Sequence, residues 1–224
     1  MRAPLGDLAA HVRRATEALV ALRGSGNLDP TASESLGAEF VRLERSLKSL
    51  ALGAERSPRA AEDLDLDALV EEELAVLALQ SRRASRVRYQ GGEPLPVRAD
   101  RGALVHTFGV LLELVRALAG TSELVEVRSL STPEGGELAG EPRAVVRLRA
   151  PAGPLATVAP AQWFLPGGLG ERIPGIGSSE LCVLARLCAA RGLSLEARSA
   201  PGAHLEIDLS VPLARHGAKL LAEA

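Results

Sequence analysis

Histidine is the side chain here best suited to chemistry at neutral pH, because a neutral imidazole is a nucleophile. Three of the four histidines are better explained as structural or solvated residues: His106, His204 and His216. His11 differs because it precedes Val12 of a helical apolar pattern and so flanks the apolar seam. Arg13 and Arg14 follow it directly. His11 is therefore either a nucleophile that a partner can reach or a solvated residue beside two arginines.

Neither the cysteines nor the charge balance indicates a second kind of site. Cys182 and Cys188 are six positions apart, which is about 600° of helix rotation, so they share no face and fit no metal or redox spacing. The 26 basic and 28 acidic residues give a net charge of −2, without the basic excess of a nucleic-acid-binding protein. One basic cluster, best interpreted as a solvated face, comprises Arg82, Arg83, Arg86 and Arg88. We predict no metal ion and no nucleic-acid partner.

The element that must position His11 is a helical hairpin over residues 1–57. Apolar residues recur there at spacings of three and four, first from Leu5 to Leu22 and again from Leu36 to Leu50. The segment GSGNLDP at 24–30 separates the two stripes and predicts a loop. Each helix offers only one narrow seam, so pairing two copies into a four-helix bundle predicts a homodimer. The alternative is that the hairpin packs on its own second domain.

Residues 64–213 predict a second domain of class α+β, followed by a tail at 214–224. Asp63 or Asp65 caps a first helix from Leu66 to about Arg83. Interleaved strands and helices follow, with antiparallel rather than parallel strands expected. The strands are 87–90, 95–99, 123–130, 143–150, 193–199 and 204–211, and the helices are 102–119, closed by Gly120, and 178–191. The N-terminus carries no long apolar segment and no stretch approaches 18 apolar residues, so we expect a cytoplasmic protein without a membrane partner.

The second domain resembles the GHKL (HATPase) fold shared by histidine kinases, a family of heat-shock chaperones and type II topoisomerases. The most specific match is GIGSSELCVLARLCAARGLSLEARSAPGAHLEIDLSVPL at 175–213, which resembles the family's glycine box, its following helix and its terminal strand pair. DLDALVEEELAVL resembles the helix that opens the domain, and VRADRGALVHTFGVLLELVRALAG resembles the strand and helix of the N box. The resemblance implies an α/β sandwich whose pocket would hold Mg-ATP.

Three departures from the family pattern fall on that pocket. The family holds Mg²⁺ through asparagine oxygens on the N-box helix, but the only asparagine here is Asn27, leaving Glu113 as the one acid of that helix. The aspartate that accepts the adenine amino hydrogen is replaced by Ala150, in the stretch Ala150-Pro151-Ala152-Gly153-Pro154. The glycine box retains Gly175 and Gly177 but continues as Ser-Ser-Glu. The resemblance therefore implies a degenerate nucleotide site and no ATP cofactor.

The hairpin resembles the dimerisation domain of histidine kinases, which carries the phosphoacceptor histidine on its first helix. AAHVRRATEALVAL is similar to that helix in position and pattern, which implies His11 as a candidate phosphoacceptor. The family usually has an acid directly after the histidine, and Val12 stands there. It often has Asn or Thr four positions after, and Ala15 stands there.

A hairpin joined to a degenerate ATPase domain is similar to the dimeric histidine phosphotransferases of bacterial phosphorelays. That resemblance implies a two-component signalling protein that docks a response regulator or a histidine kinase without using ATP. Arg13 and Arg14 would then attract the acidic pocket of a response regulator. Two alternatives remain open: a non-catalytic dimeric scaffold, and an ATP-binding kinase with unorthodox ligands such as Glu113.

Overall fold

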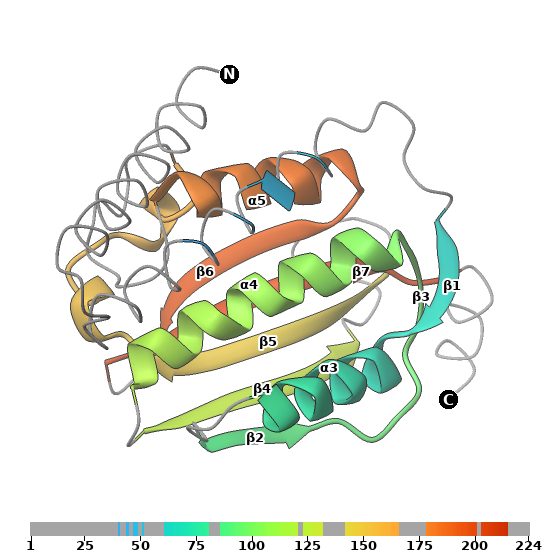
Figure 1. Cartoon of the computed structure of the whole chain (residues 1–224), viewed down its shortest axis with the longest axis horizontal. Helices are drawn as coiled ribbons and strands as arrows, with labels where there is room; N and C mark the ends of the chain where they lie inside the picture. Colours follow the sequence, from blue (N-terminus) through green and yellow to red (C-terminus); the bar gives the residue numbers. More distant parts are fainter. Residues whose placement is uncertain are drawn as a thin grey trace, which may run out of the picture.

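The structure is a computed structural model of the whole chain (Figure 1). It describes residues 40, 44, 47–48, 51, 61–80, 86–120, 123–131, 142–165, 178–200 and 203–214. Most of the predicted hairpin at 1–57 and nearly all of the predicted tail at 214–224 therefore lie outside the described residues. The structural account concerns the second domain.

The described domain has two layers, a five-stranded sheet and three helices that all cover the same face of it (Figure 1). The helices are α3 (Leu66–Gln80), α4 (Arg101–Ala119) and α5 (Ser178–Ala190). The sheet order is β2-β4-β5-β7-β6. The strands are β2 (Arg86–Gln90), β4 (Leu124–Ser131), β5 (Arg143–Pro151), β6 (Ser194–Ala200) and β7 (His204–Pro212). This is the mixed α+β architecture that the sequence predicts.

The expectation of purely antiparallel strands is wrong at one pair. β4–β5, β5–β7 and β6–β7 are antiparallel, whereas β2 and β4 run parallel with Val87 opposite Val125. A parallel pair needs a long crossover, and here α4 supplies it between β2 and β4. The edge strand β2 is therefore joined to β4 through a helix, whereas β4–β5 and β6–β7 pair consecutive strands and β5–β7 pairs strands separated by α5 and β6.

The sequence-based prediction gives the strand at 95–99 but misses its partner in a short two-stranded sheet. Glu62–Asp65 (β1) pairs antiparallel with Pro96–Ala99 (β3), beside the start of α3. The strand EDLD is hard to recognise because three of its four residues are acidic. Asp65 is the cap of α3, since its Oδ1 accepts from the backbone NH of Asp67 at 3.0 Å. The expected helix end near Arg83 lies outside the described residues.

The core lies between the helices and the sheet and is mostly aliphatic. α4 is its central helix: Asp100 Oδ1 accepts from the Ala103 NH at 3.1 Å, and Gly120 ends it with a φ of 63°. Both free cysteines are buried. By length and composition α4 could cross a membrane, which the sequence analysis does not anticipate, but 61% of its apolar window is buried inside the domain.

Candidate functional site

The C-terminal end of β5 carries Ala150, the residue expected at the adenine position. Its side chain is 0% exposed and it lies opposite Leu205 of β7. The chain then leaves the sheet, and the Ala152 NH donates to the Ala203 carbonyl at 2.8 Å. The methyl group of Ala150 belongs to the main hydrophobic core cluster. No polar atom of this side chain is available to a ligand.

Gly153 follows at the start of a 3₁₀ turn, η1 (Gly153–Leu155), with a φ of +49°. That backbone conformation is in the left-handed region that favours glycine. A Cβ atom at this position would lie 3.8 Å from the carbonyl oxygen of Leu118, in the last turn of α4. The structure therefore brings Ala150 and Gly153 together beside the C-terminal end of α4.

The segment after Gly153 packs apolar side chains into the same core cluster as Ala150. Leu155, Val158 and Trp163 are all buried there, and the Trp163 Nε1 donates to the Val158 carbonyl at 3.2 Å. A second 3₁₀ turn, η2 (Pro160–Gln162), leads into Trp163. Buried tryptophan fills a large volume, so this side of the domain is stabilised by packing and not by polar groups.

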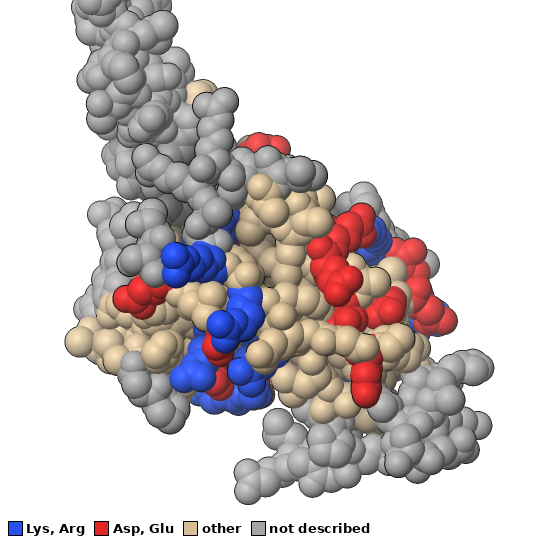
Figure 2. Space-filling view, turned by 90° about the horizontal axis from the view of Figure 1, so that it is seen from below, with Lys and Arg blue, Asp and Glu red and all other residues tan. Residues whose placement is uncertain are grey.

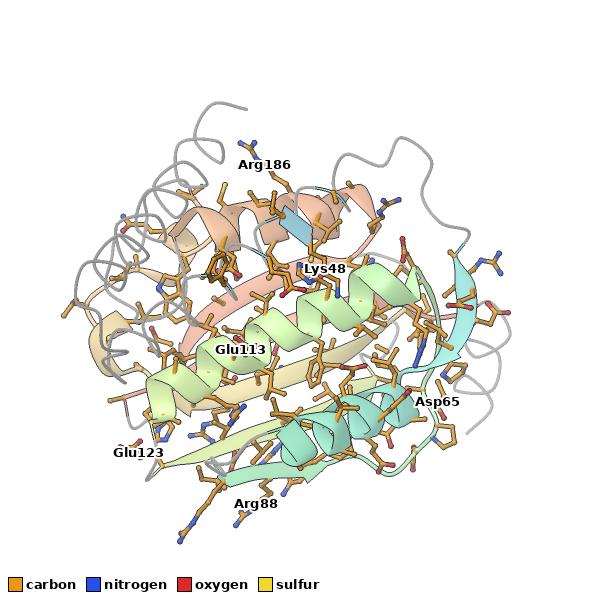
Figure 3. The ribbon with its side chains drawn as sticks, viewed as in Figure 1. Lys48, Asp65, Arg88, Glu113, Glu123 and Arg186 are labelled. Atoms are coloured by element: carbon orange, nitrogen blue, oxygen red, sulfur yellow. The ribbon has the colours of Figure 1, made fainter. Side chains whose placement is uncertain are left out.

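Glu113 is half-buried in the second half of α4, where Figure 3 labels it. The residues on either side of it, Leu112 and Leu114, are buried in the core. It precedes Leu118 by five positions, which is about 7 Å along the helix axis at the usual rise. Throughout the part of the chain that the structure describes, no group of three or more His, Cys, Asp or Glu side chains is placed to hold a metal ion.

The other predicted site residues cannot be placed relative to Ala150, Gly153 and Glu113. His11, Arg13, Arg14, Gly175 and Gly177 all lie outside the described residues. Of the other histidines, His106 is buried on α4 and His204 is half-buried at the start of β7. Glu180, which follows the glycine pattern, is buried in the first turn of α5.

Sequence reasoning misses a carboxylate network between α3 and the sheet. Asp67 is buried near the start of α3, and its carboxylate accepts hydrogen bonds from the Tyr89 hydroxyl and the Ser129 hydroxyl. It also accepts from the Gly92 NH at 3.1 Å. These groups, which we call the carboxylate network, join α3 to β2 and β4. The available signal was that Tyr89 and Ser129 follow Val87 and Val127 at alternating, inward-facing positions of their strands.

The carboxylate network is satisfied internally, which argues for a structural role. Burial raises the pKa of Tyr89, and the hydrogen bond to Asp67 raises it further, so the hydroxyl stays protonated as a donor. A Cβ atom added at Gly91 would collide with the Asp67 carboxylate and the Tyr89 hydroxyl. The turn between β2 and β3 therefore requires glycine at this position because of close approach.

A buried ion pair ties two helix ends together. Arg191 Nε lies 3.7 Å from Asp100 Oδ2, and both side chains are only 4% exposed. Asp100 also caps α4, while Arg191 follows directly after α5. One carboxylate thus fixes the start of α4 and contacts the end of α5, which positions the two helices relative to each other.

Comparison with known proteins supports the fold. No family model and no curated protein sequence matches the chain. Among solved structures, the chain is similar to the histidine kinase AdeS of Acinetobacter baumannii, with a TM-score of 0.61 and 14% identity over 94% of this chain and 95% of that one. It is also similar to full-length ShkA, described as a complex with AMPPNP, with a TM-score of 0.58 and 18% identity. That match covers 83% of this chain and 38% of the ShkA chain.

A third similar structure is the catalytic domain of the histidine kinase ThkA, with a TM-score of 0.49 and 14% identity over 69% of this chain and 97% of that one. At these identities the likeness to AdeS and ShkA concerns the fold. The described domain has a histidine-kinase-like fold, as the sequence resemblance implies. Activity and partners need their own arguments.

Proposed function

We propose that this chain is a dimeric, cytoplasmic two-component signalling protein that docks a response regulator without using ATP. One observation carries the proposal: Ala150, at the end of β5, is a fully buried methyl group in a histidine-kinase-like fold. The sequence resemblance assigns this position to a carboxylate that accepts the adenine amino hydrogen. A methyl group cannot accept a hydrogen bond, so recognition of the base loses its specific contact.

The composition of α4 supports the same conclusion for the metal. Mg²⁺ requires several oxygen ligands in near-octahedral geometry. α4 contains one acidic residue, Glu113, and no asparagine, because the only asparagine of the chain is Asn27. We therefore expect calorimetry with Mg-ATP to give no binding at physiological concentrations. Micromolar binding that Glu113→Ala abolishes would instead support an unorthodox ATP-binding kinase.

Two described residues of the second apolar stripe support a homodimer. Phe40 and Leu47 are 50% and 49% exposed in the single chain. They are seven positions apart, one heptad, so they lie on the same helix face. Large apolar side chains in register on one face are typical of an interface. Light scattering should give twice the 23.4 kDa chain mass, Leu47→Glu should lower it, and Lys48→Glu should leave it unchanged.

Phosphoryl transfer would use His11 of the hairpin. A neutral imidazole nitrogen attacks the phosphorus of an aspartyl phosphate on the regulator, forming the N–P bond as the P–O bond to the aspartate breaks. The aspartate leaves as a carboxylate with the bonding electrons. The phosphorylated imidazole is left positively charged and loses its N–H proton to water, because Val12 has no group that could accept it. Arg13 and Arg14 would attract the regulator's acidic pocket.

The test incubates the protein with a panel of phosphorylated response regulators and measures label retained in acid-labile form. Wild type is compared with His11→Gln, which keeps a similar size and hydrogen bonding but removes the nucleophile. His216→Gln is the matched control. Transfer that His11→Gln abolishes and His216→Gln retains supports the proposal. Equal transfer by the wild type and His11→Gln would refute the role of His11.

A second candidate function is a non-catalytic dimeric scaffold that binds a response regulator or a histidine kinase. The absence of an acid after His11 favours it, because Val12 can neither orient the imidazole nor accept its proton. The two functions separate in the same experiment. A scaffold retains regulator binding in a pull-down with purified regulators but transfers no label with either wild type or His11→Gln.

A further inference from the structure

The face of the sheet opposite the helices is rich in arginine. Side chains alternate along each strand, so Val87 and Tyr89 of β2 pack toward the core while Arg86 and Arg88 are exposed. β4 and β5 contribute Arg128, Arg147 and Arg149 by the same alternation. We name these five arginines the basic patch: Arg86, Arg88, Arg128, Arg147 and Arg149.

The strand register arranges charge in rows across this face. One row runs through all five strands and alternates in sign: Arg88, Glu126, Arg149, Glu206 and Arg198. In the next row, Arg128 lies directly opposite Arg147, which forms a bidentate pair with Asp208 at 2.8 and 2.9 Å. The ion pairs are thus concentrated toward β7 and β6.

Positive charge is concentrated at the β2 side of the sheet. On β2, β4 and β5 the five arginines of the basic patch accompany a single acid, Glu126. No described residue forms an ion pair with Arg86 or Arg88. The whole chain has a net charge of −2, so this local excess reflects segregation of charge and not composition. Figure 2, seen from the β2 side, shows most Lys and Arg gathered apart from most Asp and Glu.

Within the basic patch the arginine side chains are more exposed than the acidic side chains beside them. The side chains of Arg128, Arg147 and Arg149 are between 30% and 47% exposed. The side chains of Glu126, Glu206 and Asp208 are only 10% to 23% exposed. A partner approaching this face therefore meets more arginine surface than acidic surface.

The register also sets two arginines of the basic patch side by side. Arg128 lies opposite Arg147, and each has an acid beside it: Arg128 Nη2 is 3.6 Å from Glu126, and Arg147 pairs with Asp208. Charge on an edge strand can protect against edge-to-edge pairing, which would explain Arg86 and Arg88. It does not explain Arg128, because β4 lies between β2 and β5. A carboxylate bound between Arg128 and Arg147 would bridge the two guanidinium groups.

We propose that the basic patch docks an acidic surface of a partner protein through carboxylate groups on that partner. Guanidinium groups bind carboxylates in bidentate geometry, which a flat sheet face can present in register. A nucleic acid or an anionic membrane fits less well, because the whole chain carries a net charge of −2 and lacks the basic excess typical of proteins that bind them. This docking rests on the proposed function in one respect: the natural partner is taken to be a signalling protein.

The test titrates the full chain with a synthetic peptide of about twelve glutamates and follows the arginine Nε–H signals by NMR. We expect shifts confined to the basic patch and weakened as salt rises from about 50 to about 500 mM. The triple variant Arg86→Gln, Arg88→Gln, Arg128→Gln should bind about tenfold more weakly, the sum of three exposed charge contacts. The matched control removes three positive charges that lie outside the basic patch, with Arg98→Gln, Arg101→Gln and Arg186→Gln.

Four outcomes would overturn the proposal. Equal loss of affinity in the control variant would show that only net charge matters. Tighter binding of a DNA duplex, or of vesicles containing phosphatidylserine, would identify a different class of partner. Self-association of the triple variant with unchanged peptide binding would leave edge protection as the sole role. The wild type is also assayed for phosphoryl transfer, because peptide binding at the basic patch alongside absent transfer by the wild type would refute the proposed phosphotransfer while leaving the docking face intact.

Discussion

Restoring the carboxylate at the end of β5 is the perturbation that most directly tests the altered nucleotide site. The change Ala150→Asp supplies the group that the family uses for adenine. If the loss of that one group were the only obstacle, the variant would gain ATP binding. The structure predicts a different result, because position 150 is fully buried beside Leu155 and Trp163 in the hydrophobic core.

The magnitude follows from burying a charge without a partner. An uncompensated buried charge destabilises a protein by about 3 to 5 kcal/mol. Native proteins of this kind have a total stability of about 5 to 15 kcal/mol. For a chain of this length each kcal/mol shifts the melting temperature by about 2 to 4 °C, so we expect a fall of about 10 °C. Burial also raises the pKa of the introduced carboxyl group, so the loss should shrink as pH falls and the group becomes neutral.

The assay is thermal unfolding of the wild type, Ala150→Asp and Ala150→Asn between about pH 4.5 and pH 8, followed by calorimetry with Mg-ATP. Ala150→Asn is the matched control, since it has the same shape without the charge and its destabilisation should not vary with pH. An Ala150→Asp protein that melts with the wild type and binds Mg-ATP at micromolar concentration would refute the reasoning. It would mean that the end of β5 opens onto a working nucleotide pocket.

Three further predictions concern the groups that position the helices. Asp100→Ala should lower the free energy of unfolding by about 1 kcal/mol for the lost helix cap, and by several kcal/mol more because it leaves Arg191 buried without this partner. Adding Arg191→Met should recover part of the loss in urea titrations. Gly91→Ala should cost about 2 kcal/mol through collision with the carboxylate network, while Gly109→Ala, which meets no neighbouring atom, should stabilise α4. The pKa of Tyr89 is higher in the folded protein than in the unfolded chain, where it is about 10. The stability that Tyr89 contributes is therefore complete below about pH 10 and declines as pH rises above it. Tyr89→Phe should make stability fall less steeply over this range, measured by urea titrations from about pH 8 to 11.

Much of the fold could be predicted because local signals agree with the tertiary structure. The helix predicted at 102–119 is α4 at Arg101–Ala119, where an apolar run lies between a capping aspartate and a terminating glycine. The strand predicted at 143–150 is β5 at Arg143–Pro151, where buried and partly exposed residues alternate from Val146 onward. The parallel β2–β4 pair could not be predicted in this way, since it depends on which strands become neighbours and no local pattern encodes that.

The candidate site was predictable only in part, for the same reason. Ala150 and Gly153 were identified because their stretch follows a clear strand at the point where the resembling family carries its adenine-binding motif. Asp67 was not, because it is one acid among several in EDLDLDALV and its burial depends on contacts with two distant strands. The basic patch was likewise hidden: Arg86 and Arg88 were interpreted as solvated, and Arg128 joins them only through the β2–β4 register.

The two faces of the sheet have different chemistry. On the helix side, Ala150 and Trp163 belong to one apolar core cluster. Ala150 stands where the family resemblance expects the adenine-binding carboxylate, so its side chain offers the base no acceptor. On the open side, Arg128 lies opposite Arg147, and no described residue forms an ion pair with Arg86 or Arg88. Exposed guanidinium groups gathered on one face are suited to binding carboxylates, which is the basis of the docking that we propose for this face.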